Sequence, residues 1–170
     1  MIPIHSFVLL VLILLSLTGC GLAVKTAVDT ARGGTSDLLV VESVHNLRSY
    51  DSLDIMPFTN AIGGRLSPKL LAYLNDRILD DLSENGLRKI GEKQLRVSGT
   101  VLHLTDDVFQ KNILVQVRFE DAATGQSIGL VNVTGQTNSV RGLDAGVDAV
   151  ANGIVELLTQ HHFLDMDNPS

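Results

Sequence analysis

The sequence predicts an α+β fold, a mixed, mostly antiparallel sheet of about five strands with two helices packed on it, in the order β-β-α-β-β-β-α. Five stretches alternate or cluster apolar residues as strands do, and two longer stretches repeat them at helical spacing. The last three strands follow one another directly, and their short connections are typical of antiparallel neighbours. About 150 residues remain beyond an apolar leader, which suits one domain with its own core.

The leader comes first in the chain. Residues 7–17 are apolar except for Ser16, and this run is shorter than the roughly 20 residues that a membrane-spanning helix needs. Such a length is typical of the apolar part of a secretory signal peptide. An uncleaved membrane helix is the alternative. Pro3 and His5 interrupt a longer span, and no Lys or Arg precedes Lys25, a deficit that weakens both interpretations.

The leader ends at Leu17, Thr18, Gly19 and Cys20, and Cys20 is the only cysteine of the chain. A lone cysteine cannot form an intramolecular disulfide, and no base or second thiol accompanies this one. The four residues resemble the bacterial lipobox. The resemblance implies cleavage before Cys20, a diacylglycerol on its sulfur and a further acyl chain, such as palmitate, on its new amino terminus. Two or three acyl chains anchor a protein almost permanently.

Residues 1–19 are therefore predicted to be a lipoprotein signal peptide, and residues 20–37 a lipidated tether. Gly21 stands where the enterobacterial sorting pattern has Asp in proteins kept at the inner membrane, so the resemblance implies the periplasmic face of the outer membrane. The tether fits either a short amphipathic helix or a linker rich in small residues. Its apolar residues at helical spacing are Val24, Ala27, Val28 and Ala31.

The folded α/β domain is expected over residues 38–160, beginning with two strands. Residues 38–45 and 52–58 are rich in β-branched and aliphatic residues, and Pro57 ends the second run. A helix then begins with Ser67 as N-cap and Pro68 as its first residue, and ends at Gly86. Its buried stripe comprises Leu71, Leu74, Ile78 and Leu82. Its charged residues are expected to face solvent: Asp76, Arg77, Asp80, Asp81 and Glu84.

Three strands follow and are expected to form a meander. Residues 95–105 and 113–119 alternate and form an antiparallel hairpin, and a turn at residues 121–125 leads into a third strand at residues 127–137. Gly125 takes the turn position where φ is positive. One face of the first of these strands is expected to carry Leu95, Val97, Gly99, Val101 and His103.

The last helix begins near Arg141, and its buried stripe comprises Leu143, Val147, Val150, Ile154 and Leu157. A second row of small residues would let this helix lie close to the sheet, and it consists of Gly142, Gly146, Ala149 and Gly153. The polar residues of the helix exclude a membrane span. Residues 161–170 are expected to be a flexible tail.

The composition excludes some classes of function. The formal net charge is −6, with 13 Lys and Arg against 19 Asp and Glu, and no basic tract is dense enough to bind a phosphate backbone. Aromatic residues make up 4% and Trp is absent, so stacking platforms for bases are poorly supplied. Nucleic acid is therefore not expected as a partner.

The sequence predicts no enzyme, no catalytic residues, no metal and no cofactor. His45 and His103 lie in predicted strands, where packed histidines are commoner than general bases. His161 and His162 could hold a metal with Asp165 and Asp167, but adjacent histidines point apart. Two further patterns favour structure over ligand binding: Gly63-Gly64, which lacks the Gly-Lys-Ser/Thr of a phosphate loop, and the acidic helix face, which lacks a second ligand-bearing loop.

The order of elements and several short stretches resemble the small α/β domain of the TolB amino-terminal region and of the curli-secretion lipoprotein. These stretches are a strand ending at Pro57-Phe58, residues 97–101 with a strand through Gly99, and residues 119–125 with an Asp, X, X, Thr, Gly turn. The resemblance covers residues 38–160 and is closest to a family of uncharacterised lipoproteins. It implies a module for protein interactions, with no catalytic residues and no pore.

Two functions follow as hypotheses. The first is a non-enzymatic lipoprotein, held in the outer membrane by Cys20, that binds an envelope protein partner in envelope assembly or secretion. The alternative is an auxiliary lipoprotein of a transport system that binds a lipid or small solute, which requires an apolar cavity between helix and sheet. A homo-oligomer is compatible with the first hypothesis, because the edge strands of such a sheet need covering.

Overall fold

The computed structural model describes residues 34–86, 91–108, 110–138 and 141–163, all within the compact unit that spans residues 33–170. Its strands are β1 (Thr35–Glu42), β2 (Ser52–Ile55), β3 (Thr59–Asn60), β4 (Gln94–Asp106), β5 (Gln110–Asp121) and β6 (Ser127–Asn138). Its helices are α3 (Pro68–Glu84) and α4 (Leu143–Phe163), with short 3-10 turns η1 (Leu47–Ser49) and η2 (Gly63–Arg65).

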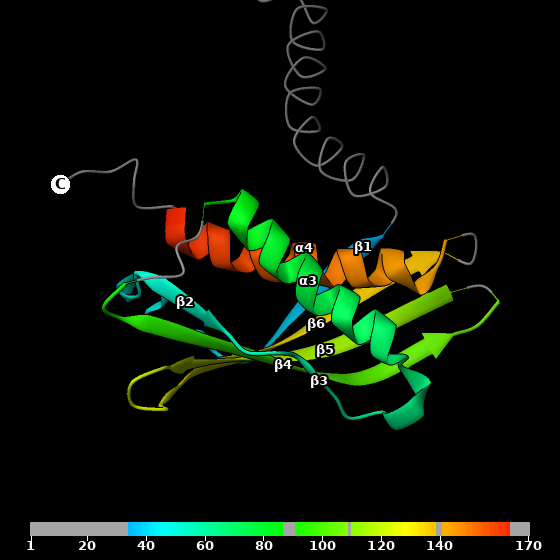
Figure 1. Ribbon diagram of the computed structural model, residues 1–170, viewed down its shortest axis with the longest axis horizontal. Helices are drawn as coiled ribbons and strands as arrows, with labels where there is room; N and C mark the ends of the chain where they lie inside the picture. Colours follow the sequence, from blue (N-terminus) through cyan, green and yellow to red (C-terminus); the bar gives the residue numbers. More distant parts are fainter. Residues whose placement is uncertain (1–33, 87–90, 109, 139–140, 164–170) are drawn as a thin grey trace, which may run out of the picture. The chain divides into compact units, whose positions relative to one another are not determined.

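The strands form one six-stranded sheet in the order β1-β6-β5-β4-β2, and β3 also pairs with β4. The pairs β1–β6, β6–β5 and β5–β4 are antiparallel, whereas β2 and β3 run parallel to β4. Helices α3 and α4 lie side by side over one face of this sheet (Figure 1). The predicted α+β class, the mixed sheet and the order of elements are confirmed, with β3 as an additional two-residue strand.

Several element ends differ from the predicted ones. β1 begins at Thr35 and ends at Glu42, three residues earlier at each end than predicted, because its register is set by pairing with β6 from Thr35↔Gln136 onward. Helix α4 continues to Phe163, into the segment predicted to be a tail. Residues 164–170 lie outside the described part of the chain. Strand length is therefore decided here by the partner strand more than by local composition.

Helix α3 forms as the sequence predicts. The Ser67 hydroxyl accepts a hydrogen bond from the Leu70 amide at 3.2 Å, which satisfies one of the free amides of the first turn. Leu74, Ile78 and Leu82 are buried against the sheet. The four-residue spacing of these side chains places them on one helix face, so α3 is held mainly by burial of that face.

The sheet has one apolar and one polar face. The helix-covered face of β4, β5 and β6 carries alternate residues that are fully buried, among them Val97, Val101, Val115, Val117, Phe119, Val131 and Val133. The prediction that His103 shares this face is wrong. A β-bulge between Val101 and His103 inserts one residue, so His103 pairs with Leu114 on the open face.

Helix α4 approaches the sheet at backbone distance through glycines, as the row of small residues predicts. A Cβ atom added to Gly135 of β6 would meet the backbone of Gly146 and lie 2.8 Å from Cγ2 of Val150. A Cβ on Gly153 would lie 3.0 Å from Ser36 of β1. The helix and the sheet can therefore approach this closely only without side chains at these positions.

A second close approach fixes the corner between β2 and β3. A Cβ atom on Gly99 would lie 2.5 Å from two ring atoms of Phe58, so the ring of Phe58 occupies the space above Gly99. The amide of Phe58 donates a hydrogen bond of 2.7 Å to Oδ1 of Asn75 in α3. Residues that the resemblance singled out, Pro57-Phe58 and the strand through Gly99, thus serve one packing contact.

We predict that Gly135→Ala destabilises the fold by about 1–3 kcal/mol, the usual cost of overpacking, because the new methyl group meets the backbone of α4. Gly64→Ala is the matched control, since a Cβ at Gly64 meets nothing within 4 Å. Urea unfolding followed by circular dichroism measures both changes. Equal stability of the two variants would show that α4 can move away from β6 at little cost.

Candidate interaction surface

The lipobox residues Leu17, Thr18, Gly19 and Cys20 lie outside the described residues, as do the side chains of His161 and His162 and all of Asp165 and Asp167. Lipidation at Cys20 therefore stays a prediction from the sequence. The search for a site here concerns the α+β domain alone, between Gly34 and Phe163.

The two internal histidines lie in different parts of the fold, His45 after β1 and His103 in β4. His45 is exposed just after β1, where its backbone amide donates to the carbonyl of Ile128 at 3.1 Å. His103 is exposed on the open face, with Nε2 2.9 Å from the hydroxyl of Thr105. Among the described residues, no group of three or more His, Cys, Asp or Glu is placed to hold a metal ion. The histidines therefore form no common site.

The expected solvent-facing side of α3 is partly an interface with α4. Asp81 is only 5% exposed and binds Arg77 at 3.0 Å, so the prediction that Asp81 faces solvent is wrong, whereas Arg77 is partly exposed. Arg77 also lies 3.4 Å from Asp148 of α4, and the Tyr73 hydroxyl donates to the same carboxylate at 2.6 Å. This polar cluster joins the two helices and has a structural role.

The Asp, X, X, Thr, Gly stretch is a hydrogen-bonded turn. Oδ1 of Asp121 accepts hydrogen bonds from the amides of Ala123 and Thr124 and from the Thr124 hydroxyl, at 2.8 to 3.1 Å. Bonds from Thr124 to this carboxylate lower the pKa of Asp121. Gly125 has φ +70°, as the turn prediction requires. These bonds explain the sequence pattern as that of a turn.

The loop between β1 and β2 is fixed to the start of β4. The buried Tyr50 donates its hydroxyl to Asp121 at 3.2 Å, and the ammonium of Lys93 lies 4.8 Å from the ring centroid of Tyr50. Asp51 accepts hydrogen bonds from the amides of Glu92 and Lys93. The loop is therefore held in one position relative to the sheet.

This loop lines a pocket of about 460 Å³, formed by Val44, Asn46, Leu47, Arg48 and Ser49. Asn46 has φ +56°, an uncommon left-handed conformation for a residue other than glycine. A Cβ on Gly129 would lie 2.7 Å from the Cα of Val44, so Val44 lies on the helix side of the sheet. The pocket therefore lies on the helix side of the sheet, just beyond the end of β1.

Strand β1 carries the exposed apolar surface of the domain. Its central residues are four consecutive aliphatics, Leu38, Leu39, Val40 and Val41, which are 42%, 65%, 54% and 49% exposed. Leu38 and Val40 pair with the buried Val133 and Val131, and so lie on the helix side, whereas Leu39 pairs with Asn132 on the open face. We call Leu38–Val41 the β1 strip. Exposed apolar patches of this kind mark interaction surfaces.

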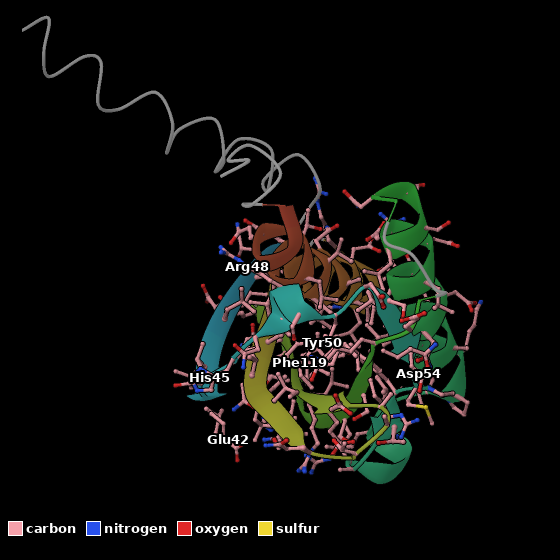
Figure 2. All side chains as sticks on the ribbon, turned by 90° about the vertical axis from the view of Figure 1, so that its left-hand side faces the viewer. Glu42, His45, Arg48, Tyr50, Asp54 and Phe119 are labelled. Atoms are coloured by element: carbon pink, nitrogen blue, oxygen red, sulfur yellow. The ribbon has the colours of Figure 1, made fainter. Side chains whose placement is uncertain are left out.

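The free edge of β1 adds unpaired backbone groups to this surface. β1 pairs with β6 on one side, and within the described residues no strand lies on its other side. The strand contains no Lys and no Pro, residues with which natural edge strands prevent pairing. Figure 2 looks onto one end of the sheet, with Glu42 and His45 on the β1 side and Asp54 on the opposite side. The β1 strip can therefore accept another strand.

The sequence predicted a strand here but did not identify it as a surface. Four aliphatics in a row are apolar on both faces, a pattern typical of a strand buried on both sides. The sequence does contain one sign that this strand lies at an edge. An acidic residue stands at each end of the aliphatic run, Asp37 and Glu42, and acidic residues are unusual in a central strand. The chemistry of this surface is backbone pairing and apolar contact, which suits binding and offers no nucleophile or base.

The fold is of the α+β class, and its exposed apolar surface is the β1 strip. No protein-family model matches the chain, and a search of curated proteins returned no match. Among solved structures, the chain is similar to a PelC variant dodecamer from Paraburkholderia phytofirmans, with 16% identity and a TM-score of 0.52, covering 74% of this chain and 96% of that one.

A further similar structure is the lipoprotein GNA1162 from Neisseria meningitidis, with 10% identity and a TM-score of 0.42, covering 64% of this chain and 98% of that one. At such identities the PelC similarity shows a shared fold. The resemblance to the TolB amino-terminal and curli-secretion domains remains a prediction. Among the described helices, none is long and apolar enough to cross a membrane.

We predict that the two tyrosines ionise above their ordinary pKa of 10. The hydrogen bond to Asp148, followed by burial, raises the pKa of Tyr73 to about 12, and burial raises that of Tyr50. Since the folded pKa of Tyr73 is the higher one, its contribution to stability is complete below pH 10 and is lost as pH rises to about 12. Ultraviolet absorbance measures this directly, because the chain has two Tyr and no Trp.

In the same titration, Asp148→Ala should move the pKa of Tyr73 down toward its ordinary value, because both the hydrogen bond and the negative charge are removed. Asp144→Ala is the control, since its charge has the smallest of the effects on Tyr73. An unchanged titration curve in Asp148→Ala would mean that the bond between α3 and α4 does not form in solution.

Proposed function

We propose that this chain is a non-enzymatic envelope lipoprotein, anchored through a lipid on Cys20 to the periplasmic face of the outer membrane. Its α+β domain binds a protein partner in envelope assembly or secretion. The lipobox resemblance of residues 17–20 supports the anchor. The similar fold of a PelC dodecamer is compatible with a role in assemblies.

The observation that carries the proposed binding function is the β1 strip on a sheet edge without Lys or Pro. Fully burying an aliphatic side chain contributes about 1.5–3 kcal/mol. The four residues of the β1 strip are half-exposed, so a partner that covers them would gain part of this free energy on binding. A strand added to the edge would also satisfy the free backbone groups. Both contributions favour a protein or peptide partner.

The lipid-binding alternative needs a cavity between the helices and the sheet. That space is occupied by fully buried side chains, including Leu74 and Ile78 of α3, Ile154 of α4 and Phe119 of β5. The pocket beside η1 lies elsewhere and is lined by Asn46, Arg48 and Ser49 as well as by two aliphatics. The packing does not favour a bound lipid, and we do not propose one.

Cys20→Ala tests the anchor. We expect this variant to lose palmitate labelling and to leave the membrane fraction, because the thiol is the group that accepts the diacylglycerol. Thr18→Ala, which keeps a small residue in the lipobox, is the matched control and should be labelled normally. If Cys20→Ala stays in the membrane at an unchanged precursor size, an uncleaved apolar helix is the anchor instead.

A photo-cross-linking residue in place of Leu39 tests the binding surface in intact envelopes. Leu39 is the most exposed residue of the β1 strip, so we expect adducts of increased protein mass. The same substitution at Arg118, exposed on the central strand β5, is the control and should give few. Adducts that contain lipid and no protein would support the transport hypothesis against this one.

A further inference from the structure

The two edges of the sheet differ in their ability to accept a strand. On the β2 side the edge is short and broken, because β2 ends at Ile55, β3 covers only Thr59–Asn60, and Pro57 lies between them. Asp54 on this edge is paired with Arg96 at 2.9 Å. Broken pairing, proline and charge are the means by which edges resist strand addition. The β1 edge lacks Pro and Lys and has an apolar centre.

We propose that the partner of the β1 strip is a second copy of this chain, whose β1 pairs antiparallel with the first across a two-fold axis at Leu39. This inference rests on the proposed function and specifies its partner. Only the β1 edge is open to strand addition. A head-to-tail contact, in which β1 of one copy pairs with the β2 side of the next, is therefore disfavoured. A two-fold contact uses the same patch twice.

The two faces of β1 select the register. Directly opposite residues of an antiparallel pair lie on the same face, so Leu39 opposite Leu39 keeps the helices of both copies on one side of the joined sheet. A shift of one residue would place Leu39, which lies on the open face, opposite Val40, which lies on the helix side. The bulge after Val40 leaves Val41 and Glu42 outside this regular pairing.

The acids at the two ends of the β1 strip, Asp37 and Glu42, have partners within their own sheet. Oδ2 of Asp37 accepts a hydrogen bond of 2.9 Å from Gln136, and Oε2 of Glu42 accepts one of 3.4 Å from Ser127, and both donors belong to β6. The carboxylates are therefore directed away from the free edge of β1. The surface left for the second copy is aliphatic.

The same register matches the two faces. Pairing Leu38 with Val40 of the other copy places aliphatic residues together on the helix side, where each is half-exposed in the single chain. Leu39 meets its counterpart on the open face. The bulge between Val40 and Glu42 limits the regular edge to residues 35–40. The paired segment is consequently short, and confinement of both copies to one membrane would favour it.

Thiol cross-linking tests this arrangement on the membrane-anchored chain, in which a lipidated Cys20 leaves no other free thiol. Under mild oxidation or with a short bis-maleimide, Leu39→Cys should form a covalent homodimer at least ten times more than Arg118→Cys, an exposed control on β5. Leu38→Cys and Val40→Cys, carried on differently tagged copies, should cross-link to each other more than to themselves. Circular dichroism confirms that each variant is folded.

Yields at Leu39→Cys no higher than at Arg118→Cys, in folded protein, would overturn the proposal. A photo-adduct at position 39 that contains a different protein would also overturn the proposal of a second copy. That result would leave the proposed binding function intact. The unsubstituted chain gives a further test. Amine cross-linking on the membrane should stop at a dimer, and a ladder of higher multiples would exclude the two-fold arrangement.

Discussion

The close approach of α4 to the sheet is the contact on which the rest of the domain depends. Gly135 lets the backbone of Gly146 lie directly over β6, and Gly153 extends this contact to Ser36. Gly34 is covered in the same way by Ala145 and Ala149, so the helix crosses β1 near its start. The second half of β1 lies beyond it. Leu38 and Val40 are exposed because α4 leaves them uncovered on the helix side, and Leu39 is exposed because it lies on the open face.

The elements whose causes are local could be predicted from the sequence. Ser67, Pro68 and Gly86 mark the limits of α3, and regular alternation marks β5. What could not be predicted depends on contacts distant in sequence. β3 has two residues and forms because Phe58 packs on Gly99, while the bulge before His103 reverses the face of that side chain without any local signal. Asp81 is buried because α4 lies beside α3.

The candidate site divides in the same way. A lipobox is a local motif and can be recognised in four residues, whereas the exposure of the β1 strip follows from strand order, which places β1 at an edge. Leu38 and Leu39 are the same residue type but lie on opposite faces of the sheet. Their faces could be assigned only from the register of β1 with β6. The Asp121 turn shows the converse: a recognisable pattern whose hydrogen bonds explain it as structure.

The predicted lipid site and the β1 edge lie close together in the chain. β1 is the first strand of the domain and follows the predicted lipid site at Cys20 after a short tether. Stable protein interfaces bury about 1,200–2,000 Å². A contact between two strand edges buries less than this, and it would be weak between freely diffusing molecules. Tethering both partners to one surface raises their effective concentration without adding any contact. If Cys20 is lipidated as proposed, a single exposed strand would be sufficient as an interface, and chains without the anchor would pair only weakly.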